Sequence, residues 1–156
     1  AEPLATPLPP RIVIPKIGVN ASIVEVTWRV AETGDGAIGV WDTADEGVGH
    51  HMDSAQPGEQ GNVVISGHSR ERGAFARLAE LTRGDEILIY TAEDRVHRYI
   101  VNESVTVPET GISLEQRRAN AHYMEPTAEA RLTLITCWPA WAYTHRLIVI
   151  ARLVSP

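Results

Sequence analysis

Residues 132–137 read LTLITC, a largely alternating apolar run that ends in the only cysteine among the 156 residues. Alternation of this kind is typical of a β-strand with one buried face. The dipeptide Trp138-Pro139 follows directly and ends the strand, because proline has no backbone N–H to donate to a sheet. We therefore expect a strand that carries a thiol at its tip.

The same kind of pattern recurs along the chain and favours an all-β fold. Short, β-branched apolar segments predict further strands at residues 11–14, 21–26, 61–65, 86–90, 96–107 and 146–154. The segments at 86–90 and 96–107 are separated by TAEDR and predict a hairpin. Seven or so strands with turn signals between them favour a closed or nearly closed β-barrel.

Helices are expected at only two places. Phe75, Leu78 and Leu81 recur at helical spacing before Gly84, which predicts a short amphipathic helix over residues 74–81. Residues 114–122 predict a second helix that ends before Pro126. Residues 33–60 carry six glycines and are expected to be mostly loop.

Length and composition fit one globular domain. Hydrophobic residues make up 44% of the chain, which is enough for a core, and the net charge of -6 argues against nucleic acid as a partner. No apolar run approaches the roughly 20 residues of a membrane-spanning helix. The opening AEPLATPLPP predicts a proline-rich tether over residues 1–10, before a domain at 11–156. We expect a membrane anchor upstream of this chain.

A thiol nucleophile needs a histidine beside it, since a free thiol is only a few per cent ionised at pH 7. His68 has the best setting of the six histidines, because it follows the predicted strand at residues 61–65, after Ser66 and Gly67. His97 lies inside a predicted strand and could be a surface residue. Arg146 opens the last strand and could stabilise the oxyanion formed on attack, whereas His145 would face the other way.

Each of these residues has a plainer interpretation when it is taken alone. A lone cysteine on an apolar strand is more often a buried core thiol, and His68 and Arg146 are more often a turn residue and a strand-edge charge. His50 and His51 with Asp53 could form a metal pair, although a loop turn is favoured. Three of the four tryptophans could line a groove or cap the barrel ends: Trp41, Trp138 and Trp141.

Four segments together resemble the sortase family of bacterial cysteine transpeptidases. TLITC at 133–137 resembles the TLxTC signature of the family, and PGEQGNVVISGH at 57–68 resembles the PGExGNxxIxGH segment that ends in its catalytic histidine. FARL at 75–78 with LTRGD at 81–85 resembles the passage that follows, and HRLIVIA at 145–151 resembles the last strand with the catalytic arginine. The matches keep the family's order and cover about residues 11–153.

The resemblance implies an eight-stranded barrel in which Cys137 is the nucleophile, His68 the acid/base and Arg146 the group that positions the substrate or stabilises the oxyanion. It implies cleavage of an LPxTG-like sorting signal on a surface protein, a thioester, and transfer to an amine of the cell wall or of a pilin, on the outer face of the bacterial membrane. The Trp138-Pro139 step and the short gap to Arg146 resemble class D or class E members. No cofactor is expected. Some members of the family bind calcium through clustered carboxylates in the loop before the TLITC strand. The carboxylates there are spread out, so solvated charge is favoured and calcium stays open as the alternative: Glu109, Glu115, Glu125 and Glu129.

Three alternatives stay open at this point. A thiol endopeptidase would use the same residues with water as the acceptor. A non-enzymatic barrel that binds a partner would bury an unreactive Cys137. A metal-dependent hydrolase would be built on His50, His51 and His68.

Overall fold

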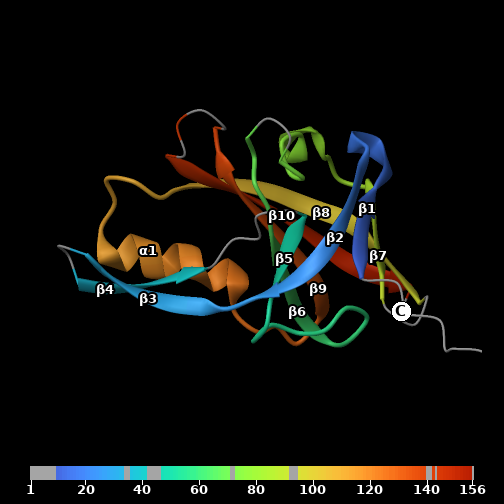
Figure 1. Ribbon diagram of the computed structural model, residues 1–156, viewed down its shortest axis with the longest axis horizontal. Helices are drawn as coiled ribbons and strands as arrows, with labels where there is room; N and C mark the ends of the chain where they lie inside the picture. Colours follow the sequence, from blue (N-terminus) through green and yellow to red (C-terminus); the bar gives the residue numbers. More distant parts are fainter. Residues whose placement is uncertain are drawn as a thin grey trace, which may run out of the picture.

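The strands close into a barrel, as the sequence predicts. The computed structural model describes residues 10–33, 36–41, 47–70, 73–91, 95–139, 142 and 144–155, so nearly all of the predicted tether lies outside the described residues. Eight strands pair in the order β1-β2-β5-β6-β9-β10-β8-β7, and β7 closes on β1 (Figure 1). Their bounds are β1 Arg11–Ile14, β2 Val19–Val26, β5 Val48–His51, β6 Gly61–Ser66, β7 Glu86–Tyr90, β8 Val96–Pro108, β9 Ala130–Trp138 and β10 His145–Ser155.

Two of the eight strand pairs are parallel, and one of them determines where the site lies. β2 pairs with β5 and β6 pairs with β9 in the parallel sense, whereas the other neighbours are antiparallel. Parallel strands need a long crossover connection. The chain makes this crossover between β6 and β9 through β7, β8 and a helix. The carboxyl ends of β6 and β9 therefore meet at the same end of the barrel.

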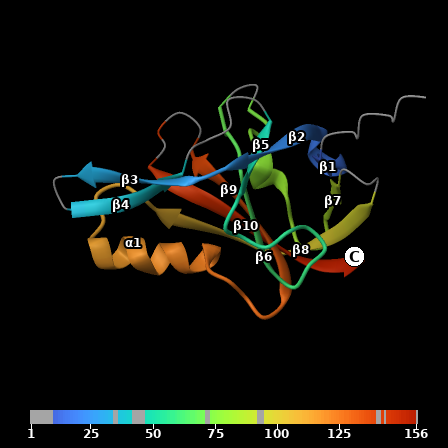
Figure 2. The same ribbon diagram turned by 60° about the horizontal axis from the view of Figure 1, so that its bottom comes forward.

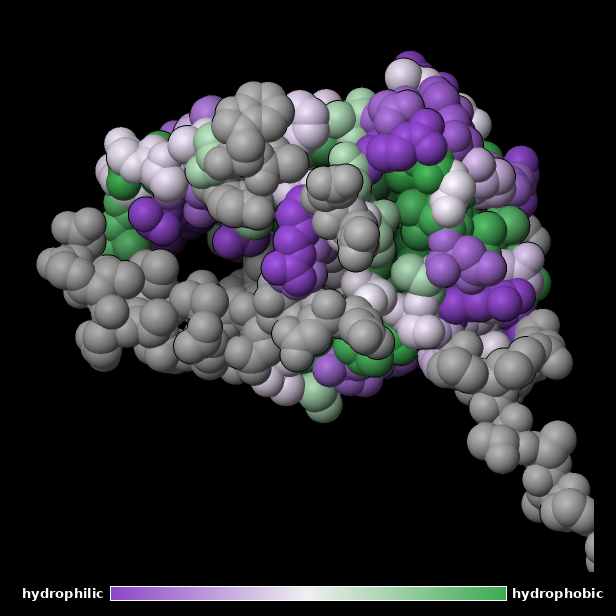
Figure 3. All heavy atoms as spheres, turned by 45° about the horizontal axis from the view of Figure 1, so that its top comes forward, coloured by the Kyte–Doolittle hydropathy of each residue, from purple (hydrophilic) through white to green (hydrophobic). Residues whose placement is uncertain are grey.

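The alternation of β9 and β10 separates an inner from an outer apolar layer. Leu132 and Leu134 are fully buried in the barrel interior, in a core cluster to which all eight barrel strands contribute. Ile135 and Ile148 point to the outer surface, where they pack under Tyr123 in a second, smaller cluster. Full burial of one such aliphatic side chain stabilises the fold by about 1.5–3 kcal/mol. On the face drawn in Figure 3, hydrophilic and hydrophobic residues are interspersed among the described side chains.

The segment expected to be mostly loop also contains strands that the sequence did not predict. It holds the end of β3 (Trp28–Thr33), which pairs with β4 (Gly36–Trp41) as a separate two-stranded sheet, and it holds all of β5. The four residues of β5, VGHH, are all buried and show no alternation that a sequence pattern could detect. The β3–β4 hairpin and helix α1 (Leu114–Ala121) extend from the same side of the barrel (Figures 1 and 2).

The helical predictions are confirmed in part. α1 forms as expected and is capped by the side chain of Ser113, which accepts a 3.1 Å hydrogen bond from the backbone of Gln116. The helix expected over residues 74–81 is instead a turn followed by the 3-10 helix η2 (Leu78–Glu80). Two further 3-10 helices are η1 (Pro15–Ile17) and η3 (His122–Met124). None of the helices described has the length and apolar character that crossing a membrane requires.

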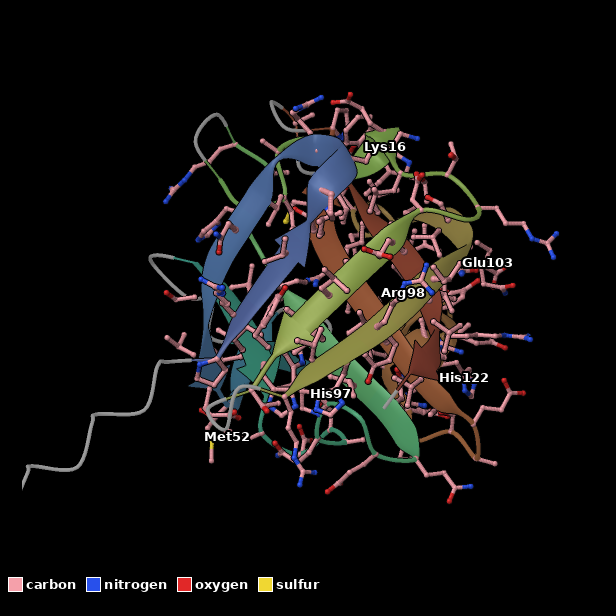
Figure 4. The ribbon with its side chains drawn as sticks, turned by 90° about the vertical axis from the view of Figure 1, so that its right-hand side faces the viewer. Lys16, Met52, His97, Arg98, Glu103 and His122 are labelled. Atoms are coloured by element: carbon pink, nitrogen blue, oxygen red, sulfur yellow. The ribbon has the colours of Figure 1, made fainter. Side chains whose placement is uncertain are left out.

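A surface position was considered for His97, and the structure shows the side chain buried instead. Its side chain is only 7% exposed, because the ring packs directly over Gly58, where any Cβ would lie 2.3 Å from the imidazole. Figure 4 shows His97 at one end of the barrel and Lys16 at the other. Burial and the positive charge of Arg95 both lower the pKa of His97. His97 is therefore a packed core histidine.

Candidate active site

The cysteine and the arginine are direct neighbours across two strands. Cys137 of β9 and Arg146 of β10 are Cα partners in the antiparallel register. Side chains at paired positions of antiparallel strands point to the same face. Cys137 has the same parity as Ile135, and Arg146 the same parity as Ile148, so both belong to the outer face. Cys137 is a free, half-buried cysteine and not the buried core thiol of the plainer interpretation.

His68 arrives from the other side of β9. The parallel register pairs Ser66 with Ile135, and two hydrogen bonds continue the contact beyond the end of β6. The backbone N–H of Gly67 donates to the carbonyl of Ile135 at 3.1 Å, and the hydroxyl of Thr136 donates to the carbonyl of Gly67 at 2.8 Å. His68 is two residues beyond Ser66, and Cys137 is two residues beyond Ile135, so the parallel run brings His68 level with Cys137. The half-buried His68 therefore lies on the opposite side of Cys137 from Arg146.

Gly67 is needed because a side chain packs against it. A Cβ at this position would lie 2.7 Å from Cδ2 of Phe75, a residue that is only 1% exposed. The backbone N–H of Phe75 in turn donates to the carbonyl of His68 at 2.9 Å. The close approach at this glycine is made by an aromatic ring. The ring holds the His68 loop against the barrel.

Arg146 forms an ion pair with an acidic residue that the sequence did not single out for this role. Nε of Arg146 lies 3.1 Å from Oε1 of Glu109, and both side chains are largely buried, with 30% and 23% exposure. Nη1 of Arg117, from α1, lies 4.0 Å from Oε2 of the same carboxylate. Glu109 therefore stands between two arginines, one at the site and one on the helix.

His51 is the second residue near the site that the sequence did not place there. Its side chain is 2% exposed, and its Nε2 lies 3.1 Å from the hydroxyl of Ser66 on the neighbouring strand. The pKa of His51 is lowered to about 4, chiefly by burial; Asp53 acts in the opposite direction, and the electrostatic interactions with His50 and Arg146 lower the pKa as well. His51 is therefore neutral at physiological pH and lies within the electrostatic reach of Arg146.

The favoured loop turn forms only at Met52 and Asp53, after the two histidines, and His50 and His51 do not form the metal pair that was considered. The two residues lie in β5, where neighbours point to opposite faces. Nδ1 of His50 lies 2.8 Å from Glu25, and its Nε2 lies 2.8 Å from the carbonyl of Ala55. Within the described parts of the chain, no three His, Cys, Asp or Glu side chains are grouped to hold a metal ion.

The carboxylates considered for calcium each have a different setting. Glu109 faces Arg146, Glu125 pairs with His122 at 2.9 Å, and Glu129 lies 3.8 Å from Arg152. Each of these three carboxylates thus lies beside a cationic group or a histidine and not beside the others. Of the tryptophans, Trp138 packs against the barrel core, as a capping residue would, whereas the side chain of Trp41 and all of Trp141 lie outside the described residues.

Comparison with known proteins identifies the family. The family model described as the Sortase domain matches residues 12–154. The chain belongs to the sortase family. Among curated sortases, the chain is similar to Sortase D of Bacillus subtilis, with 31% identity over 127 residues that cover 81% of this chain and 52% of that protein. It is also similar to Sortase A of Listeria monocytogenes, with 30% identity over 104 residues that cover 65% of this chain and 42% of that protein.

Solved sortases share the fold as well. A Sortase D5 transpeptidase of Clostridium perfringens matches with a TM-score of 0.69 and 28% identity, covering 94% of this chain and 78% of that one. Sortase A of Corynebacterium diphtheriae matches with a TM-score of 0.72 and 27% identity, covering 97% of this chain and 63% of that one. The expected likeness to class D is consistent with the two Sortase D relatives. The chain spans about half the length of the curated sortases it matches.

Proposed function

We propose that this sortase is a cysteine transpeptidase that uses Cys137, His68 and Arg146. The observation that carries the proposal is the register of three neighbouring strand ends: Cys137 is the Cα partner of Arg146, and Gly67, the residue before His68, is hydrogen-bonded to β9. A thiol and a permanent cation on adjacent strands, with an imidazole just beyond the end of a third, suit acyl transfer through a covalent intermediate. The substrate is a peptide with an LPxTG-like sorting signal on a surface protein.

The reaction proceeds in two halves. The Cys137 thiolate attacks the carbonyl of the threonine in the signal, and Arg146 stabilises the negative charge that develops on the oxygen. His68 as imidazolium gives its proton to the departing glycine amine, which leaves a thioester on Cys137. Neutral His68 then takes a proton from the incoming amine as that amine attacks the thioester, the new amide bond forms, and the Cys137 thiolate leaves beside the imidazolium form of His68.

The acceptor and the cellular setting follow from the same proposal. The acceptor is an amine of the cell wall or of a pilin, and the enzyme works on the outer face of the bacterial membrane, held there by a segment upstream of this chain. Water as the acceptor would make the protein a thiol endopeptidase. The non-enzymatic binding barrel is not favoured, because the family model spans nearly the whole domain.

Turnover of a labelled LPxTG peptide with an added amine tests the assignment. Cys137→Ala should abolish transfer, and His68→Ala should remove most of it. Arg146→Ala should lose about 3 kcal/mol of transition-state stabilisation, roughly a 100-fold lower rate, as other oxyanion donors do. Arg152→Ala is the matched control, because it removes an exposed arginine from the same strand and should leave turnover unchanged.

Two results would count against the proposal. Near-normal turnover in the His68 or Arg146 variant would remove that residue from the mechanism. Formation of the hydrolysed acid alone, across several amines, would replace transpeptidation by hydrolysis. The thermal unfolding of each variant is measured alongside, so that a lost fold is not counted as lost chemistry.

A further inference from the structure

We propose that Glu109 is a positioning residue for Arg146 and sets the guanidinium against the reacting carbonyl. The proposal rests on the role of Arg146 given above. Glu109 does not touch the substrate in this scheme, and it acts only through the arginine. The proposal is based on the ion pair at the outer face of the barrel, where Oε1 of Glu109 lies 3.1 Å from Nε of Arg146.

The backbone fixes Glu109 relative to the strand that carries the arginine. Glu109 follows the end of β8, where Pro108 is the Cα partner of His145. The N–H of Glu109 donates to the carbonyl of Thr144 at 2.9 Å, two residues before Arg146. The side-chain amide of Asn120 donates to the carbonyl of Pro108 at 2.7 Å and ties α1 to the same point. The carboxylate therefore approaches Arg146 from an anchored position.

The carboxylate is held by charge on two sides. Arg117 of α1 lies 4.0 Å from Oε2, while Arg146 lies beside Oε1. A carboxylate with a permanent cation on each side has little freedom to turn away. Both members of the Arg146 pair are largely removed from solvent, so their attraction is screened less than that of a surface pair.

The contact is made at Nε, and this matters for catalysis. Arginine has a long side chain with many rotamers, and its fork of donors is useful only when its plane is fixed. A carboxylate beside Nε fixes that plane while the Nη end extends further along the side chain. Catalytic groups that are misplaced by 1 Å lose up to about a hundredfold in rate. Without Glu109, Arg146 should lose its fixed plane.

The test measures kcat and KM for peptide acylation in Glu109→Gln, an isosteric change that removes only the charge. We expect kcat to fall about tenfold to a hundredfold, with KM within about threefold, because the arginine acts on charge that develops in the transition state. Glu109→Asp keeps the charge on a side chain one methylene shorter and should recover part of kcat. Glu115→Gln makes the same chemical change on an exposed residue of α1 and should match the wild type.

A double variant separates positioning from a structural role. If Glu109 acts only through Arg146, then Glu109→Gln should add no further loss in the Arg146→Ala background, since effects that share one group are not additive. A structural role would lower kcat by the same factor in both backgrounds and would overturn the proposal. A Glu109→Gln enzyme with unchanged or raised kcat would also overturn it. If Arg146→Ala still lost its activity in that case, only the role of Glu109 would be refuted, and the proposed function would stand.

Discussion

Lowering the pH should destabilise this protein through His51 in particular. The imidazole is 2% exposed, and its folded-state pKa is about 4, against 6.5 in the unfolded chain. Between these two values the unfolded state binds more protons than the folded state, so stability must fall as the pH falls from 6.5 towards 4. The whole difference of 2.5 pKa units corresponds to about 3 kcal/mol. Most of it, about 2 kcal/mol, is lost between pH 7 and pH 4.5.

Urea unfolding followed by tryptophan fluorescence at several pH values measures this effect. Carboxylates also titrate in the same range, so the informative quantity is the difference between the wild type and His51→Gln, whose side chain stays neutral throughout. We expect the variant to lose about 2 kcal/mol less stability than the wild type over this interval.

A second variant tests the cause of the shift. Burial is the largest contribution to the low pKa of His51. Ser66→Ala removes the hydroxyl 3.1 Å from the ring but leaves the imidazole in place, and it should therefore keep the wild-type pH dependence. If the wild type and His51→Gln lose the same stability between pH 7 and pH 4.5, the reasoning from burial is refuted.

Two further changes test how the site is supported. Gly67→Ala should lower the rate of acylation at least tenfold, because the new methyl group meets the buried ring of Phe75 and must shift the loop that carries His68. Adding Phe75→Leu should restore part of the rate. A fully active Gly67→Ala enzyme would contradict this prediction. Asn62→Ala should lower the free energy of unfolding, measured in urea, by on the order of 3 kcal/mol, because the buried amide donates to two backbone carbonyls after α1 and accepts from Thr133. A loss below about 1 kcal/mol would contradict this and would mean that water replaces these bonds.

The sequence predicted those parts of the site that depend on local pattern. Cys137 and Arg146 mark the end and the start of strongly apolar strands, and His68 follows a strand and a glycine, so each could be assigned to a strand end from its neighbours alone. The seven predicted strands form for the same reason. What the sequence does not contain is the pairing of β6 with β9, which depends on a crossover of more than 60 residues between them.

The residues that were missed depend on pairings of this long-range kind. Glu109 meets Arg146 only because β8 and β10 are neighbours, and nothing local distinguishes it from the other acidic residues of its loop. His51 was taken for part of a loop because β5 is short and has no alternation. Its low pKa results from burial by the assembled barrel, which residue type and spacing do not reveal.

The most direct test of the account is the mass of the intact protein after incubation with a library of LPxTG-like peptides in the absence of an added amine. A sortase that works as proposed should gain the mass of the peptide up to and including its threonine, on Cys137. The adduct should disappear on addition of an amine or hydroxylamine, and it should be absent from Cys137→Ala. If peptides are cleaved while no adduct can be trapped on Cys137, or if Cys137→Ala still cleaves them, the central claim is wrong.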